Sequence, residues 1–122
     1  MKKILFIVSL HNFDYESFFY AKQYLEKKEF EVVLASKTEK TIFEKETQST
    51  LEIDLNKEEI QLKEFSAVFL ISETSSSKNY LGDATVNDIL NDCARYNIFS
   101  GTIYKESKKE IKDYLDGFLE IL

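Results

Sequence analysis

The segment Ile98–Ser107 holds the residues whose types and order come nearest to a catalytic site. It reads Ile-Phe-Ser-Gly-Thr-Ile-Tyr-Lys-Glu-Ser, which is typical of a buried strand that runs into a turn and then a helix. Enzymes with open parallel sheets often hold a nucleophile on such a turn, at the carboxyl end of the sheet. Here Tyr104 stands at the apex, and a phenol with a pKa of about 10 is a weak nucleophile at neutral pH.

Glu16 is the second candidate for chemistry. It stands at the start of the first predicted helix, where the helix dipole favours a carboxylate. It is either an ordinary first-turn acid or a pocket carboxylate that faces the turn of Tyr104. A carboxylate beside a phenol disfavours ionisation of the phenol, so Glu16 is poorly suited to activate Tyr104.

Further polar residues follow the predicted strands and are pocket candidates. They are His11, Ser72, Glu73 and Lys105. For His11, the single histidine, a loop hydrogen bond is the simpler explanation, and the serine-rich stretch after Ile71 also suits a solvated loop.

Cys93 is the single cysteine, and its helical spacing with Ile89 and Leu90 predicts a buried structural thiol. No His, Cys and carboxylate cluster has metal-ligand spacing. The three glycines are too far apart for a phosphate-binding loop. We therefore expect no metal and no cofactor.

Composition indicates one domain and excludes some partners. The chain has 122 residues, 43% of them hydrophobic, and a net charge of −6 with lysines scattered among glutamates. Nucleic acids and anionic membrane surfaces are poor partners for such a surface. The apolar run Ile4–Leu10 is too short to span a membrane and has no cleavage site after it, and a lone cysteine suits a reducing compartment. A cytoplasmic protein is expected.

Continuous apolar runs without alternating polar residues predict strands that are buried on both faces. Segments whose apolar residues have helical spacing lie between these runs. The polar stretch Lys37–Asn56 predicts short hairpin-like strands or an irregular excursion, and Asn56 is expected to cap a helical turn as far as Glu64. The pattern predicts a three-layer, flavodoxin-like α/β sandwich, with about four parallel strands in the order 2-1-3-4 and helices on both faces. The predicted strands are Lys3–Leu10, Glu31–Ser36, Ser66–Ser72 and Ile98–Tyr104, and the predicted helices are Tyr15–Lys28, Asp83–Tyr96 and Ser107–Leu122.

Several stretches in this order resemble the ThiJ/PfpI family, which includes the parkinsonism-associated deglycase and intracellular PfpI-type proteases. The resemblance implies a glutamine-amidotransferase-like fold and a tendency to form dimers, and it covers almost the whole chain. It rests on order and spacing, and its parts are Lys3–Val8, Phe13–Glu16, Leu25–Ser36, Leu51–Leu55, Glu64–Leu70 and Asp83–Tyr96.

The chain departs from the family at the family's functional positions. The family's third strand usually ends in Pro-Gly-Gly, where Ile71, Ser72 and Glu73 stand here. Its nucleophile elbow reads roughly Ala-Ile-Cys-His-Gly-Pro. The aligned residues here are Thr102–Ser107, so that Tyr104 replaces the cysteine. Glu16 alone matches a functional residue of the family. The family's closing elements are lacking, which suggests a single, C-terminally shortened domain over residues 1–122.

Two functions remain open at this point. The first is a non-catalytic binding or interaction protein, a pseudoenzyme that forms a homodimer; a small-molecule ligand stays open. The alternative is a divergent hydrolase or lyase acting on a small carbonyl compound, with Glu16 and either Tyr104 or Lys105 as acid/base groups. An open pocket in which Glu16 and Tyr104 meet would favour the enzyme.

Overall fold

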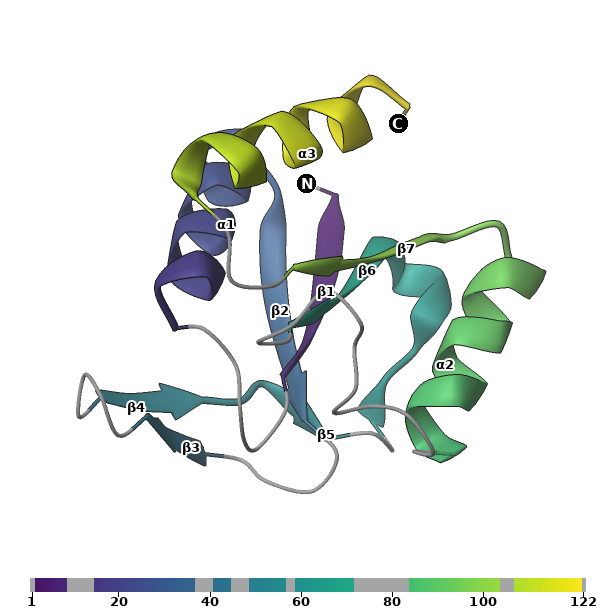
Figure 1. Ribbon diagram of the computed structural model, residues 1–122. Helices are drawn as coiled ribbons and strands as arrows, with labels where there is room; N and C mark the ends of the chain where they lie inside the picture. The colour runs from purple at the N-terminus through teal and green to yellow at the C-terminus, as the bar shows by residue number, and fades with distance from the viewer. Residues whose placement is uncertain are drawn as a thin grey trace.

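A computed structural model describes residues 2–8, 15–36, 41–44, 49–56, 59–71, 84–103 and 107–121 (Figure 1). Its helices are α1 (Tyr15–Lys27), α2 (Ala84–Arg95) and α3 (Lys108–Glu120), with a 3-10 turn η2 (Leu62–Glu64). Its strands are β1 (Lys3–Val8), β2 (Glu31–Ser36), β3 (Thr41–Glu44), β4 (Ser49–Glu52), β5 (Leu55–Asn56), β6 (Phe65–Ile71) and β7 (Phe99–Ile103). None of the helices in these ranges is both long and apolar enough to cross a membrane.

The central sheet is parallel and has the order β5-β2-β1-β6-β7. Its four longer strands confirm the predicted order 2-1-3-4, because β2, β1, β6 and β7 are the second, first, third and fourth predicted strands. The two-residue strand β5 extends the sheet beyond β2, where Leu55 pairs with Ala35.

The polar excursion after β2 contains the predicted hairpin. Strands β3 and β4 pair antiparallel, with Thr41 opposite Glu52. Asn56 pairs with Ser36 at the end of β5, and the predicted helical turn follows it as 3-10 conformation at Glu59 and at Leu62–Glu64. The 3-10 turn η2 leads directly into β6.

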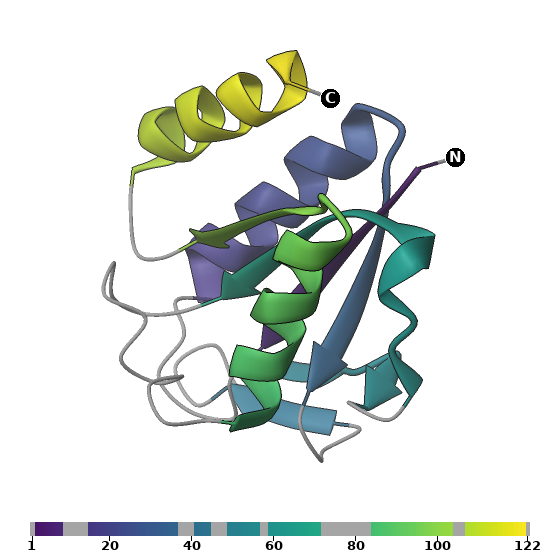
Figure 2. The same cartoon turned by 90° about the vertical axis from the view of Figure 1, so that its right-hand side faces the viewer.

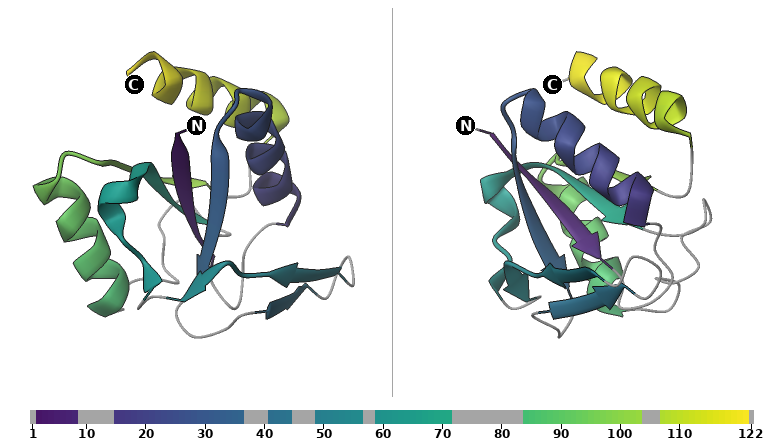
Figure 3. Two further views of the ribbon diagram at one scale, coloured as in Figure 1. Left: turned by 180° about the vertical axis from the view of Figure 1, so that it is seen from behind. Right: turned by 90° about the vertical axis from the view of Figure 1, so that its left-hand side faces the viewer.

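Strand β1 is buried on both faces, as its unalternated sequence predicts. Ile4, Phe6 and Val8 belong to a core shared with α1 and α3, whereas Leu5 and Ile7 belong to a second core that includes Cys93 of α2. The helices α1 and α3 accordingly lie on one side of the sheet and α2 on the other (Figures 2 and 3). The result is the predicted three-layer sandwich.

Helices α1 and α2 end in the same kind of tight turn. After α1, Glu29 has a φ of 69° and the N–H of Phe30 donates to the carbonyl oxygen of Leu25 at 3.1 Å. After α2, Asn97 has a φ of 58° and the N–H of Ile98 donates to the carbonyl oxygen of Cys93 at 2.8 Å. Each turn satisfies the last carbonyl groups of its helix and directs the chain into the next strand, β2 or β7.

One aromatic side chain of α1 points outward, although the helical spacing of the sequence allows it to share a face with Phe18, Ala21 and Leu25. Phe18, Ala21 and Leu25 of α1 are buried as expected, but Phe19 is 44% exposed. Phe18 is the first residue of a stripe that continues at i+3 and i+7, and Phe19 is rotated about 100° away from it. Phe19 stacks instead on Tyr15, at a distance of 6.0 Å between ring centroids.

Helix α3 is held against β6 and β7 by aromatic packing around Phe69. The Phe69 ring contacts Phe6, Phe99, Tyr114 and Phe118, with centroid distances of 5.3 to 6.1 Å. Gly101 of β7 makes room for this arrangement, because a Cβ atom there would collide with the Tyr114 hydroxyl.

A polar contact links α3 to α1 at the rim of this core. The Tyr24 hydroxyl donates to the carboxylate of Asp116, and Lys112 Nζ lies 2.9 Å from Asp116 Oδ2. The hydrogen bond from Tyr24, and then that from Lys112, lowers the pKa of Asp116 below its ordinary value. The bonds therefore favour the ionised form of Asp116 and join the two helices outside the apolar core.

Replacing Phe69 tests the aromatic packing. Phe69→Ala should lower the free energy of unfolding by about 3–5 kcal/mol, because it removes a fully buried ring and leaves a cavity. Phe19→Ala, which removes an equal but exposed ring, should cost less than about 1 kcal/mol. Chemical denaturation of both variants measures the difference, and equal losses would contradict the packing described here.

Candidate functional site

The carboxyl ends of the strands form one edge of the sheet, where the sequence places its candidate site. Val8 pairs with Ile71, and Ile71 pairs with Ile103, so that β1, β6 and β7 end in register. Helix α1 begins at this edge, and Glu16 lies in its first turn with an exposed side chain. The scaffold expected around a nucleophile elbow is therefore present.

The other predicted site residues cannot be placed on this scaffold. His11, Ser72, Glu73, Tyr104 and Lys105 lie outside the described residues. A pocket shared by Glu16 and Tyr104 thus stays a prediction.

Ser36 is a described polar residue at the same edge that sequence reasoning did not single out. It ends β2 and is 2% exposed, and its hydroxyl has no hydrogen-bond partner among the described residues. Buried hydroxyls are usually paired, so an unpaired one at a strand end is of interest in a search for ligand sites. A serine that closes an apolar run is a weak signal in the sequence alone.

Cys93 is not available as a nucleophile. It is fully buried on the inner face of α2, as the sequence predicts. Burial raises the pKa of its thiol, and the charge of Asp92 raises it further. Because the thiolate is the reactive form, both effects suppress cysteine chemistry at this position.

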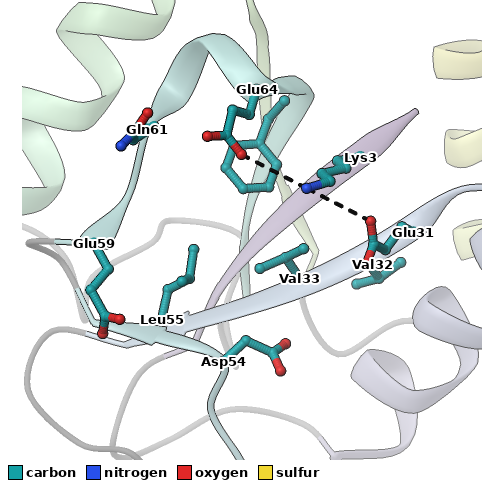
Figure 4. A pocket seen from close by; sticks show the side chains of 10 residues that line it. Lys3, Glu31, Val32, Val33, Asp54, Leu55, Glu59, Gln61 and Glu64 are labelled. Carbon is teal, nitrogen blue, oxygen red and sulfur yellow. Dashed lines mark ion pairs between the residues drawn. The ribbon is translucent and has the colours of Figure 1, made fainter. Parts of the chain in front are cut away.

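The described residues also form a groove beside β2, which reaches the amino ends of the strands. It lies between β2 and residues 59–65 and has a volume of about 460 Å³ (Figure 4). Val33, Leu55 and Phe65 supply its apolar lining. Helix α2 packs against η2 and β7 and supplies none of the described lining residues of the groove.

The charged lining of the groove is mostly acidic. Four carboxylates, those of Glu31, Asp54, Glu59 and Glu64, stand against one ammonium group, that of Lys3. Lys3 Nζ lies 4.0 Å from Glu31 Oε2 and 3.8 Å from Glu64 Oε2 (Figure 4). Among the described lining residues the carboxylates outnumber the ammonium groups, which gives this part of the groove a negative potential.

Sequence reasoning missed the groove because it looked to the carboxyl ends of the strands. A signal was present, since Lys3, Glu31 and Glu64 stand at or next to the first residue of β1, β2 and β6, which are neighbours in the sheet. Parallel strands bring such residues to one edge of the sheet. Within the described ranges, no group of three or more His, Cys, Asp or Glu side chains is arranged to hold a metal ion.

The reactivity of Cys93 provides a test of its burial. A thiol reagent such as dithionitrobenzoate should label the native protein very slowly and the denatured protein fast, because the buried thiol is neutral and inaccessible. The matched control is Cys93→Ala/Gln23→Cys, which presents a thiol at an exposed position of α1 and should react rapidly while folded. Fast labelling of native Cys93 would contradict the structure.

No protein-family model and no curated protein matches the sequence. Solved structures do match. A ThiJ/PfpI domain protein from Brachyspira murdochii has a TM-score of 0.69 and 20% identity, over 82% of this chain and 57% of that one. Drosophila melanogaster DJ-1beta has a TM-score of 0.69 and 16% identity, over 83% and 54%. An isoprenoid biosynthesis protein with an amidotransferase-like domain, from Ehrlichia chaffeensis, has a TM-score of 0.61 and 10% identity, over 84% and 61%.

These structures agree with the resemblance noted in the sequence. In each of the three, the chain described here spans less than two-thirds of the matched protein's length. At identities of 10% to 20% the likeness concerns the fold. The chain has the flavodoxin-like α/β fold of the ThiJ/PfpI and DJ-1 superfamily proteins, in agreement with the fold class predicted from its sequence.

Proposed function

We propose that this chain is a single ThiJ/PfpI-like domain that works in the cytoplasm as a non-catalytic binding or interaction protein and forms a homodimer. The observation that supports the loss of catalysis is the burial of Cys93, the only cysteine. The family's nucleophile position holds Tyr104 instead. The fold itself does not decide the matter, because one fold can serve unrelated functions.

The position of Glu16 points in the same direction. Its side chain is exposed in the first turn of α1. Acid/base residues gain most from a water-excluding site, where burial and neighbouring charges tune their proton affinity. A solvated first-turn glutamate is explained by its favourable interaction with the helix dipole.

Activity assays test the absence of catalysis. The protein should give no turnover above the protein-free rate in assays for glyoxal removal, deglycation and peptide hydrolysis, because it lacks an accessible thiol nucleophile. Activity that is present in the wild type and lost in Glu16→Gln would overturn the proposal in favour of a divergent hydrolase or lyase. Glu110→Gln is the control, since Glu110 caps α3 and lies on a different helix.

Self-association is supported by strand β7, the last strand of the sheet beyond β6. Its sequence, Phe-Ser-Gly-Thr-Ile, contains no charged residue and no proline, although natural edge strands usually carry such protection. Ser100 on this strand is exposed, as are Tyr96 (41%), which precedes β7, and Tyr114 (36%) of α3, whose hydroxyl lies beside Gly101. Two copies related by a two-fold axis would pair their β7 strands antiparallel and extend the sheet across the dimer.

Sedimentation equilibrium tests the dimer. The wild-type protein should sediment as a dimer, and Ser100→Lys should shift it to monomer because like charges would meet across the axis. Gln23→Lys adds the same charge at an exposed position on α1 and should leave the dimer intact. A wild-type protein that stays strictly monomeric at high concentration would contradict the proposal.

A further inference from the structure

We infer that the groove beside β2 binds an extended, lysine- or arginine-bearing segment of a partner protein, which adds to the sheet as a strand at Val32. The inference rests on the proposed binding role but uses a different surface from β7. It follows from the backbone of β2, from Asp54 and β5, which cover part of the outer edge of that strand, and from the charge of the groove.

The backbone groups of β2 alternate between its two sides. The N–H of Glu31 donates to the carbonyl oxygen of Lys2 at 2.9 Å, so Glu31 directs its backbone groups toward β1. Neighbouring residues of a strand point these groups to opposite sides. Val33 and Ala35 therefore also bond toward β1, whereas Val32 and Leu34 direct their N–H and C=O groups outward.

Most of the outward edge is already covered. The N–H of Leu34 donates to Asp54 Oδ2 at 2.9 Å, and the Leu34 carbonyl oxygen accepts from the N–H of Asp54 at 3.0 Å. Strand β5 pairs with β2 only at Ala35 and Ser36. Val32, which lines the groove, is the outward residue of β2 that neither Asp54 nor β5 covers. An incoming strand could satisfy its N–H and its C=O group, the usual mode of strand addition.

The lining of the groove selects the chemistry of that strand. Val33, Leu55 and Phe65 provide apolar surface for the methylene chain of a lysine or arginine, while the acidic residues around them meet its charged end (Figure 4). Glu31 and Glu64 share one lysine, Lys3, and are 52% and 53% exposed, so both can accept a further cation.

Charge also distinguishes between a basic partner segment and a second copy of this chain as the occupant of the groove. The chain has 22 acidic and 16 basic residues, so a second copy would bring net negative charge to an acidic groove. Like-charge contact of this kind opposes association, whereas a basic segment is attracted. The structure therefore favours a basic partner over self-association at this surface.

Peptide binding tests the inference. The probe is a short, fluorescein-labelled peptide of alternating lysine and threonine with blocked ends; glutamate replaces lysine in the control peptide. The lysine peptide should bind, should bind more weakly as salt is added, and should bind roughly fivefold more weakly to Glu31→Gln/Glu64→Gln. Asp113→Asn/Glu120→Gln removes two exposed carboxylates of α3 and should bind like the wild type. No binding, or equal binding of both peptides, would overturn the inference.

Two backbone measurements distinguish strand addition from loose electrostatic attraction. Lysine peptides N-methylated at alternate residues should differ, because one methylation pattern blocks the bonds to Val32 and the other leaves them free. Amide exchange at Val32 should slow on binding, whereas exchange at Val33, already bonded to β1, should not change. Equal binding of the two N-methylated peptides would overturn the inference. Amide exchange at Val32 that slows with rising protein concentration in the absence of peptide would also overturn it, because it would indicate self-association at β2.

The proposed peptide binding in the groove and the proposed dimer can be disproved separately. Ser100→Lys should change sedimentation and leave peptide binding unchanged, and Glu31→Gln/Glu64→Gln should do the reverse. Loss of both properties in either variant would contradict the assignment of two separate surfaces.

Discussion

The burial of β1 on both faces governs the arrangement of the whole chain. Residues Ile4–Val8 expose almost no surface, and every side chain among them needs an apolar layer above or below. Helices α1 and α3 supply one layer, and α2, with residues 60–62, supplies the other. Strand β2 lies parallel to β1 because the chain returns to it through α1, and β7 lies parallel to β6 because the chain returns through α2.

The two ends of the sheet consequently offer different chemistry. At the carboxyl end, the register of β1, β6 and β7 would hold a catalytic turn, yet the residues that follow these strands lack a cysteine. The groove beside β2 instead combines apolar surface, an uncovered stretch of β2 at Val32, and an acidic lining. In the proposed binding role, that combination would present hydrogen-bonding groups and charge to a chain segment.

The sequence predicted the fold well because buried strands and amphipathic helices leave a strong local pattern. The run Ile4–Val8 and the spacing of Ile111, Leu115 and Phe118 define their elements without tertiary information. Local patterns did not predict that Asn56 would pair with Ser36, since the pairing depends on where β5 meets β2. The groove was missed for the same reason, because its lining comes from chain segments far apart in sequence, and Glu16 is the one predicted site residue that the structure describes.

The turns at Glu29 and Asn97 bear on how the chain folds. Both residues hold a left-handed backbone that glycine adopts freely and that costs other residues roughly 1 kcal/mol. Each turn bonds the last carbonyl groups of its helix and also directs the chain into the next strand, so it serves both elements. The end of each helix should therefore become ordered together with β2 or β7, so that helix and strand form as one cooperative unit during folding.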